Sequence, residues 1–137
     1  AKLAGLPQLM IHGPVPRAAI FSRMESMEFL LNIGNADAFQ LPSKLADYLV
    51  AGRPIVNLCQ VEADSFAAAA EGHPAILNVF REENGFSGQK MAELFQFLEK
   101  NKGFRMPADY LEKQKKRFSA QKISQEYIQL LFGQKKR

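Results

Sequence analysis

Short apolar runs that alternate with amphipathic stretches constrain the fold of this sequence more than any other feature. Four runs read as buried strands, at residues 9–12, 29–33, 54–59 and 75–80. Helical periodicity separates them, at residues 17–27, at residues 42–51, and in an Ala-rich stretch that Asp64 can cap and that ends at Ala70. Repeated strand, helix, strand units need right-handed crossovers and bury both faces of a sheet. We therefore expect a three-layer, Rossmann-like α/β domain with a mainly parallel sheet of about four strands.

The pattern changes to helices alone after Gly85, with predicted helices at residues 87–101, 107–118 and 119–132. Two apolar stripes at helical spacing lie in this tail and predict packing seams: Met91, Leu94, Phe95 and Leu98 in one, and Ile123, Tyr127, Leu130 and Leu131 in the other. We treat residues 1–137 as a single domain. Because few residues precede the first predicted strand, we expect the front part of a doubly wound sheet to be missing.

Composition excludes several classes of protein. The 137 residues are 47% hydrophobic, enough for one core, yet no apolar run approaches the roughly 20 residues that span a bilayer. Cys59 is the only cysteine, which rules out a disulfide framework or a multi-cysteine metal site within the chain. The start lacks the features of a secretory signal, so we expect a cytoplasmic protein.

The formal charge of +4 is concentrated near the end of the chain, at residues 113–117 and 135–137. These segments contain no nucleic-acid motif and no interleaved stacking aromatics, so we expect no nucleic-acid partner. The basic terminal helices leave open a peripheral contact with the inner face of a membrane.

Two loops have the chemistry of a ligand site, because ligands of open parallel sheets bind beyond the carboxyl ends of the strands. They are residues 13–16 and residues 34–41, and the second leads into a predicted helix that carries Ser43, Lys44 and Asp47 on one side. A hydroxyl and an ammonium group suit a diphosphate, and a carboxylate one turn later suits a ribose diol. Alternatively, Ser43 caps the helix and Lys44 forms an exposed ion pair with Asp47.

The segment Gln40-Leu41-Pro42-Ser43-Lys44-Leu45-Ala46-Asp47-Tyr48-Leu49-Val50-Ala51-Gly52-Arg53-Pro54-Ile55-Val56 resembles the donor-site signature of GT-B glycosyltransferases, especially the group-one, or family-four, enzymes. Residues 11–16 and 28–33 are similar to the neighbouring strands of that domain, and residues 118–131 are similar to its closing helix. The resemblance covers nearly the whole chain and implies the C-terminal, donor-binding half of a two-domain enzyme.

The resemblance also implies roles for particular residues. Asp47 matches the acidic residue that binds the ribose, which is more often Glu in the family. The backbone around Leu41, Pro42 and Ser43, with Lys44, would contact the diphosphate, and Val15 would contact the base. Asn35 and Gln40 are further donor-binding candidates in the loop before the helix.

The implied activity is a retaining transfer of sugar from a nucleoside diphosphate sugar of the UDP or GDP type. The family's basic pair and its acceptor-binding domain belong to earlier parts of such an enzyme, so the implied partner is a missing N-terminal domain. We accordingly place no catalytic residue in this chain, expect no metal and no other cofactor, and predict that it is inactive alone.

Two other interpretations stay open. His12 or His73 could act as a general base in a different enzyme, since imidazole titrates near physiological pH. The chain could instead be a stand-alone α/β interaction or regulatory module without catalysis, whose terminal helices dock a partner.

Overall fold

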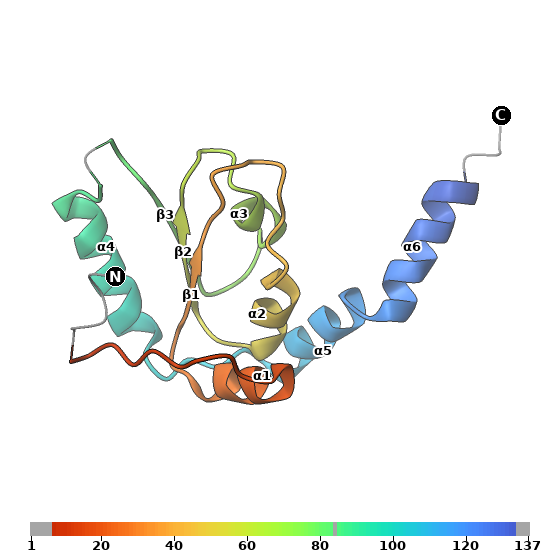
Figure 1. The fold of residues 1–137 in the computed structure, drawn as a ribbon, viewed down its shortest axis with the longest axis horizontal. Coiled ribbons are helices and arrows are strands. Elements are labelled where there is room, and N and C mark those ends of the chain that lie inside the picture. The colour runs from red at the N-terminus through yellow and green to blue at the C-terminus, as the bar shows by residue number, and fades with distance from the viewer. Residues whose placement is uncertain (1–6, 84, 134–137) are drawn as a thin grey trace.

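A computed structural model describes residues 7–83 and 85–133. Its sheet has three parallel strands, and their order in the sheet, β1-β2-β3, is the same as their order in the sequence (Figure 1). The bounds are β1 Leu30–Ile33, β2 Ile55–Cys59 and β3 Ile76–Phe80. Helices separate successive strands, so the chain is an α/β domain of the predicted kind, compatible with a Rossmann-like fold.

Helices cover both faces of the sheet. In Figure 1 the helices between the strands lie on one side of the sheet and the long helix α4 lies on the other. The bounds are α1 Arg17–Ser26, α2 Leu45–Ala51, α3 Ser65–Ala69, α4 Gly88–Asn101, α5 Ala108–Arg117 and α6 Ala120–Phe132. The predicted three layers are therefore present, and each predicted helix appears with ends shifted by a few residues.

The prediction of a strand at residues 9–12 is wrong. These residues form no regular structure and pair with no strand, and Met10 and Ile11 are 77% and 67% exposed. The described part of the chain thus has three strands where about four were expected. An apolar run becomes a strand only where a partner supplies hydrogen bonds and a neighbouring layer buries it, and here neither condition is met.

Helix α2 begins at Leu45, three residues later than predicted. Pro42 to Lys44 form a turn in which the Leu45 N–H donates to the Pro42 carbonyl, 3.0 Å away. The helix ends at Gly52, whose φ of 70° is left-handed, a conformation that glycine adopts without steric cost. A Cβ at Gly52 would also lie 2.7 Å from Cδ2 of Leu111 in α5, so the absence of a side chain lets α5 pack closely against this turn.

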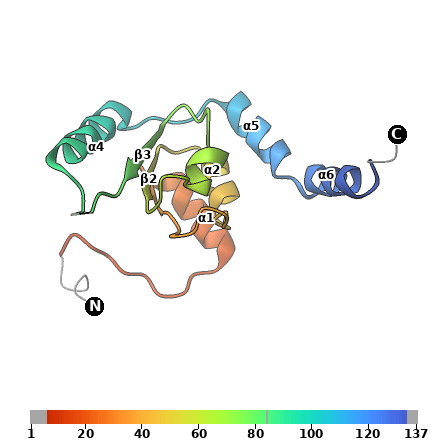
Figure 2. The ribbon, with the colours of Figure 1, turned by 90° about the horizontal axis from the view of Figure 1, so that it is seen from above.

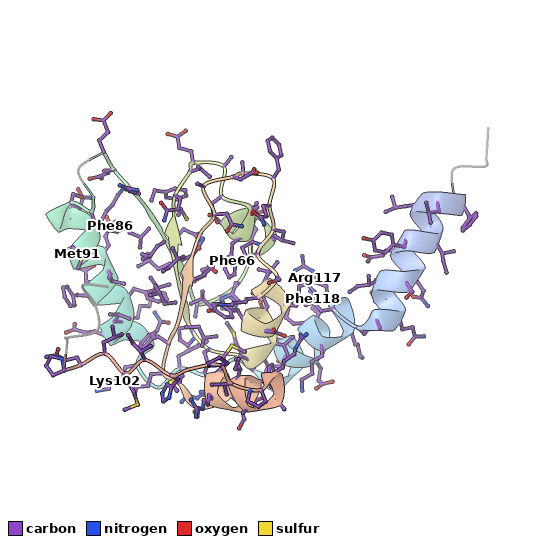
Figure 3. All side chains as sticks on the ribbon, in the orientation of Figure 1. Phe66, Phe86, Met91, Lys102, Arg117 and Phe118 are labelled. Atoms are coloured by element: carbon purple, nitrogen blue, oxygen red, sulfur yellow. The ribbon has the colours of Figure 1, made fainter. Side chains whose placement is uncertain are left out.

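The hydrophobic core lies between the sheet and the layer of α1, α2 and α3. Phe66 of α3 is completely buried, and Figure 3 shows it between the sheet and α2. Its ring meets the ring of Tyr48 edge to face, with centroids 6.2 Å apart. The other buried members of this cluster are Met24, Leu30, Leu45, Leu49, Ala51, Ile55 and Ala70.

A row of asparagines crosses the same face of the sheet. Asn32, Asn57 and Asn78 occupy matching positions of the three strands. Asn32 donates to the Asn57 side chain at 2.8 Å, and Asn57 donates at 3.0 Å both to Asn78 and to Asp64. Asp64 in turn accepts from the Ala67 N–H and so caps α3. Each amide of the row thereby has a partner inside an otherwise apolar layer.

The opposite face of the sheet is covered less completely. Leu94 and Leu98 of α4 line a cavity of about 310 Å³ together with Leu31, Val56 and Leu58 of the sheet. The ring of Phe97 lies near that of Phe29, with centroids 6.4 Å apart. The other two members of the predicted α4 stripe, Met91 and Phe95, are 38% and 60% exposed. The packing seam of α4 is therefore rotated from the predicted one and uses Phe97.

Helices α5 and α6 behave differently. Helix α5 packs on the domain through Leu111 and the buried Gln114, and at its end the Arg117 guanidinium lies 5.1 Å from the centre of the Phe118 ring (Figure 3). Helix α6 extends away from the sheet in both views (Figures 1 and 2), and it buries none of its residues. The predicted packing seam of α6 is therefore wrong for the described structure. None of the described helices is long and apolar enough to cross a membrane.

Candidate functional site

A cavity of about 410 Å³ opens beside the carboxyl end of β1. The strand forms one wall and the loop that leads into α2 forms the other. Its lining residues are Leu31, Asn32, Ile33, Asn35, Gln40, Leu41, Pro42, Ser43, Lys44 and Tyr48. This is the end of a parallel sheet at which ligands of α/β proteins bind.

A second cavity of about 360 Å³ adjoins the first, because Ser43, Lys44 and Tyr48 line both. It lies between α1 and α2, and its remaining lining residues are Arg17, Ile20, Met24 and Asp47. Together the two cavities form a continuous surface along one side of the turn at residues 42–44. Their size is in the range of small-molecule sites.

Hydrogen bonds from neighbouring elements hold the loop of the first cavity. The Gln40 carbonyl accepts from Asn35 Nδ2 at 2.9 Å and from the Ser65 hydroxyl at 2.8 Å. At the start of the loop, the Gly34 N–H donates to the Leu58 carbonyl at 2.8 Å. A Cβ at Gly34 would collide with the Asp64 carboxylate, so the loop leaves the sheet where only glycine fits.

Seven of the eight predicted donor-binding residues line these cavities. Asn35, Gln40, Leu41, Pro42, Ser43 and Lys44 line the first, and Ser43, Lys44 and Asp47 line the second. Val15 is half-buried but lines neither cavity. The reason is that residues 9–12 do not join the sheet, so the loop that follows them does not reach its carboxyl edge.

The structural roles considered for Ser43 and Lys44 are not observed. Helix α2 has no side-chain cap, so Ser43 does not cap it. Asp47 pairs with Arg17 of α1 at 3.0 Å instead of pairing with Lys44. Among the described residues, Lys44 forms no ion pair, so its ammonium group is available to an anion in either cavity.

Tyr48 is a site residue that sequence reasoning missed. It lines both cavities, and its hydroxyl donates to the Leu31 carbonyl at 3.0 Å. Burial raises the pKa of Tyr48, so the phenol is neutral at physiological pH. Its position within the segment that resembles the donor-site signature, one residue after Asp47, was a usable signal.

Asn32 and Arg17 were missed as well. Asn32 lines the first cavity, and its place in the middle of an apolar run marked it as a residue with a special role. Arg17 comes from a helix 30 residues before Asp47, and no local spacing reveals such a contact.

His73 has a structural role in the described fold. It is 6% exposed, its Nδ1 accepts from the Ala75 N–H at 3.2 Å, and its ring meets Tyr110 edge to face at 5.7 Å. Burial lowers the pKa of His73 from 6.5 to about 4. His12 is exposed and lines neither cavity. The described residues also contain no group of three His, Cys, Asp or Glu side chains suited to a metal ion.

The lowered pKa of His73 predicts a loss of stability in mild acid. The unfolded chain binds a proton at His73 below pH 6.5, whereas the folded chain does so only near pH 4. Stability from neutral His73 is therefore present above pH 6.5 and is lost as the pH falls toward 4. As the pH falls from 7 to 4.5, protonation of His73 should lower the free energy of unfolding by on the order of 2 kcal/mol.

Urea unfolding of the wild type and of His73→Gln at both pH values measures this effect. The variant cannot titrate at this position, so its stability should fall less over the same interval. Equal losses in the two proteins would show that His73 is not the group responsible.

Comparisons with protein-family models, with curated proteins and with solved structures find no match to this chain.

Proposed function

We propose that this chain is the donor-binding part of a retaining glycosyltransferase and that it binds a nucleoside diphosphate sugar. One observation carries the proposal. Seven residues predicted from the sequence to contact the donor line two adjoining cavities, one beside the carboxyl end of β1 and one between α1 and α2. The proposed activity comes from the resemblance to GT-B enzymes, and the proposed position of the ligand comes from the two cavities.

In this proposal, different polar groups of the cavities bind different parts of the nucleotide sugar. Ser43 and Lys44 line both cavities and offer a hydroxyl and an ammonium group to the diphosphate. Asp47 in the second cavity accepts hydrogen bonds from the ribose diol. The cavity beside β1, whose lining includes Gln40 and Asn35, is then available to the sugar.

A ribose at Asp47 must displace or share Arg17. The Arg17 side chain is 86% exposed and that of Asp47 is 28% exposed, so their ion pair is largely solvated. Pairs of this kind contribute about 0–1 kcal/mol, which a bound nucleotide can replace. Because Arg17 lines the second cavity together with Ser43 and Lys44, the released guanidinium would add a second positive charge to the cavity that takes the phosphates.

Transfer of the sugar requires more than these cavities provide. In this proposal the acceptor and the catalytic groups come from an N-terminal domain, and the reaction takes place between the two domains. The chain alone would then bind the donor but would not transfer the sugar.

Calorimetric titration with UDP, GDP, ADP and their sugars tests the proposal. We expect saturable binding of one diphosphate, weakened by about 10-fold to 100-fold in Asp47→Ala and in a Ser43→Ala, Lys44→Ala double variant. Two exposed residues outside the cavities serve as matched controls, Asp109→Ala and Lys102→Ala, and these should bind like the wild type.

Two results count against a donor site. Equal affinity in all variants would place the nucleotide elsewhere on the chain. No binding at millimolar nucleotide, by a chain that unfolds cooperatively, would favour the stand-alone interaction module, for which the exposed apolar side chains of α6 are the supporting observation.

A further inference from the structure

Helix α6 exposes more large apolar side chains than any other described helix or strand. Its apolar residues are between 40% and 73% exposed, and they are Ile123, Tyr127, Ile128, Leu130, Leu131 and Phe132. Figure 1 shows the helix extending away from the sheet and its helices. A contiguous apolar surface of this kind in a folded protein marks a contact with another molecule or with a lipid surface.

The apolar side chains occupy a wide face of α6. At 100° per residue, they spread over about half of the circumference and are densest in the last turn and a half. The opposite face carries Gln125, Gln129 and the pair Lys122 and Glu126, whose charged atoms are 3.5 Å apart. A narrow stripe fits the seam of another helix, whereas a broad apolar face fits a flat apolar medium.

Charge is segregated toward the same end of the chain. The 25 residues from 113 to 137 contain eight Lys or Arg residues and one Glu, a formal charge of +7. The 112 residues before them contain ten basic and 13 acidic residues, a formal charge of −3. Within the described residues, Lys113 and Lys116 of α5 form no ion pair.

The positive charges lie on both sides of α6 in the sequence. Lys113, Lys115, Lys116 and Arg117 come from the last turns of α5, and Lys135, Lys136 and Arg137 follow α6. A helix with a broad apolar face and flanking cations lies in the interface of a bilayer. There the apolar side chains enter the acyl region and the cations reach anionic headgroups.

Other occupants fit these observations less well. A second copy of the chain would bring its own basic residues 113–117 against those of the first. A nucleic acid would use the cations, but it gives aliphatic side chains such as Leu130 and Leu131 nothing to bury against.

We propose that α6, with the basic end of α5, binds the surface of an anionic membrane. The helix lies parallel to the bilayer, with Tyr127, Leu130 and Leu131 in the interface and the lysines of α5 at the headgroups. This attachment is peripheral. It rests on the surface of α5 and α6 and is independent of the proposed donor site.

Flotation of the whole chain with lipid vesicles tests the proposal. We compare vesicles of phosphatidylcholine alone with vesicles that contain 30% phosphatidylglycerol. Binding to the anionic vesicles should be at least about 10-fold stronger and should weaken as the salt concentration rises.

Variants separate the two contributions. Leu130→Gln with Leu131→Gln should weaken binding by about 10-fold or more, because burial of two leucines in the acyl region is lost. Lys113→Gln and Lys116→Gln should each weaken binding by about fivefold, as expected for one lysine at an anionic surface. Because these positions are exposed, thermal unfolding should remain unchanged and confirms that each variant is folded.

Matched controls come from the rest of the surface. Phe95→Gln changes an exposed aromatic side chain of α4, and Lys102→Gln changes an exposed cation at the end of that helix (Figure 3). Both should bind vesicles like the wild type.

Three results would overturn the proposal. Absent or equal binding to the two kinds of vesicle excludes an anionic membrane as the partner. Self-association that the leucine variants abolish, without vesicle binding, assigns the surface to a second copy. Binding to DNA or RNA that exceeds vesicle binding, and that only the lysine variants weaken, assigns it to a nucleic acid.

Discussion

Replacing Phe66 with alanine is expected to lower the free energy of unfolding by about 3–5 kcal/mol, the cost measured for large aromatic deletions in protein cores. The ring is completely buried, and it packs within the cluster that joins α2, α3 and the sheet. Its edge-to-face contact with Tyr48 would be lost as well. Since domains are commonly stable by only about 5–15 kcal/mol, the variant should be partly unfolded near physiological temperature.

Urea denaturation followed by circular dichroism measures this loss. Phe39→Ala is the matched control, because Phe39 is 96% exposed and its removal should change stability by less than about 0.5 kcal/mol. A loss below about 1 kcal/mol in Phe66→Ala would mean that this ring does not fill the centre of the core.

Replacing Asn57 with alanine is expected to destabilise the fold by about 3 kcal/mol. Asn57 is completely buried and joins Asn32, Asn78 and Asp64 through its side chain. Its removal leaves an amide donor at Asn32 and an acceptor at Asn78 without those partners inside the protein. Unsatisfied buried groups cost about 1–3 kcal/mol each.

Two further variants distinguish the loss of the hydrogen bonds of Asn57 from the loss of its side-chain volume. Asn35→Ala, at a half-buried position of the loop, removes one hydrogen bond and should cost less than about 1 kcal/mol. Replacing all three asparagines of the row with valine removes the donors and acceptors of the row together. Asp64 loses its Asn57 partner in both variants, so the triple variant should cost less than Asn57→Ala alone. A triple variant that is the least stable of the set would contradict this account.

Much of the fold followed from periodicity and capping residues. The runs at residues 29–33, 54–59 and 75–80 became β1, β2 and β3, because each pairs with a neighbouring strand and packs apolar side chains of one face into the core. Asp64, Ser87 and Ser119 accept hydrogen bonds at the starts of α3, α4 and α6, as their residue types suggest. These signals depend on residues only a few positions apart, so the sequence alone reveals them.

The errors occurred where an element depends on a distant partner. Residues 9–12 and α6 have apolar patterns as regular as those of buried elements, yet both are exposed in the described structure. Periodicity states which side chains share a face, and it does not state what covers that face. Val15 was misplaced for the same reason, since its position relied on the first predicted strand.

The sequence by itself determined the alternation of strands and helices, the parallel direction of the strands and the segment at residues 35–47 that lines part of each cavity. Tertiary structure alone decided that Asp47 pairs with Arg17, that Tyr48 lies between the cavities and that three asparagines form one row. Local elements follow from the spacing of residues a few positions apart. Contacts between residues 21 to 30 positions apart follow only from how helices and strands pack, because chain folding sets those distances.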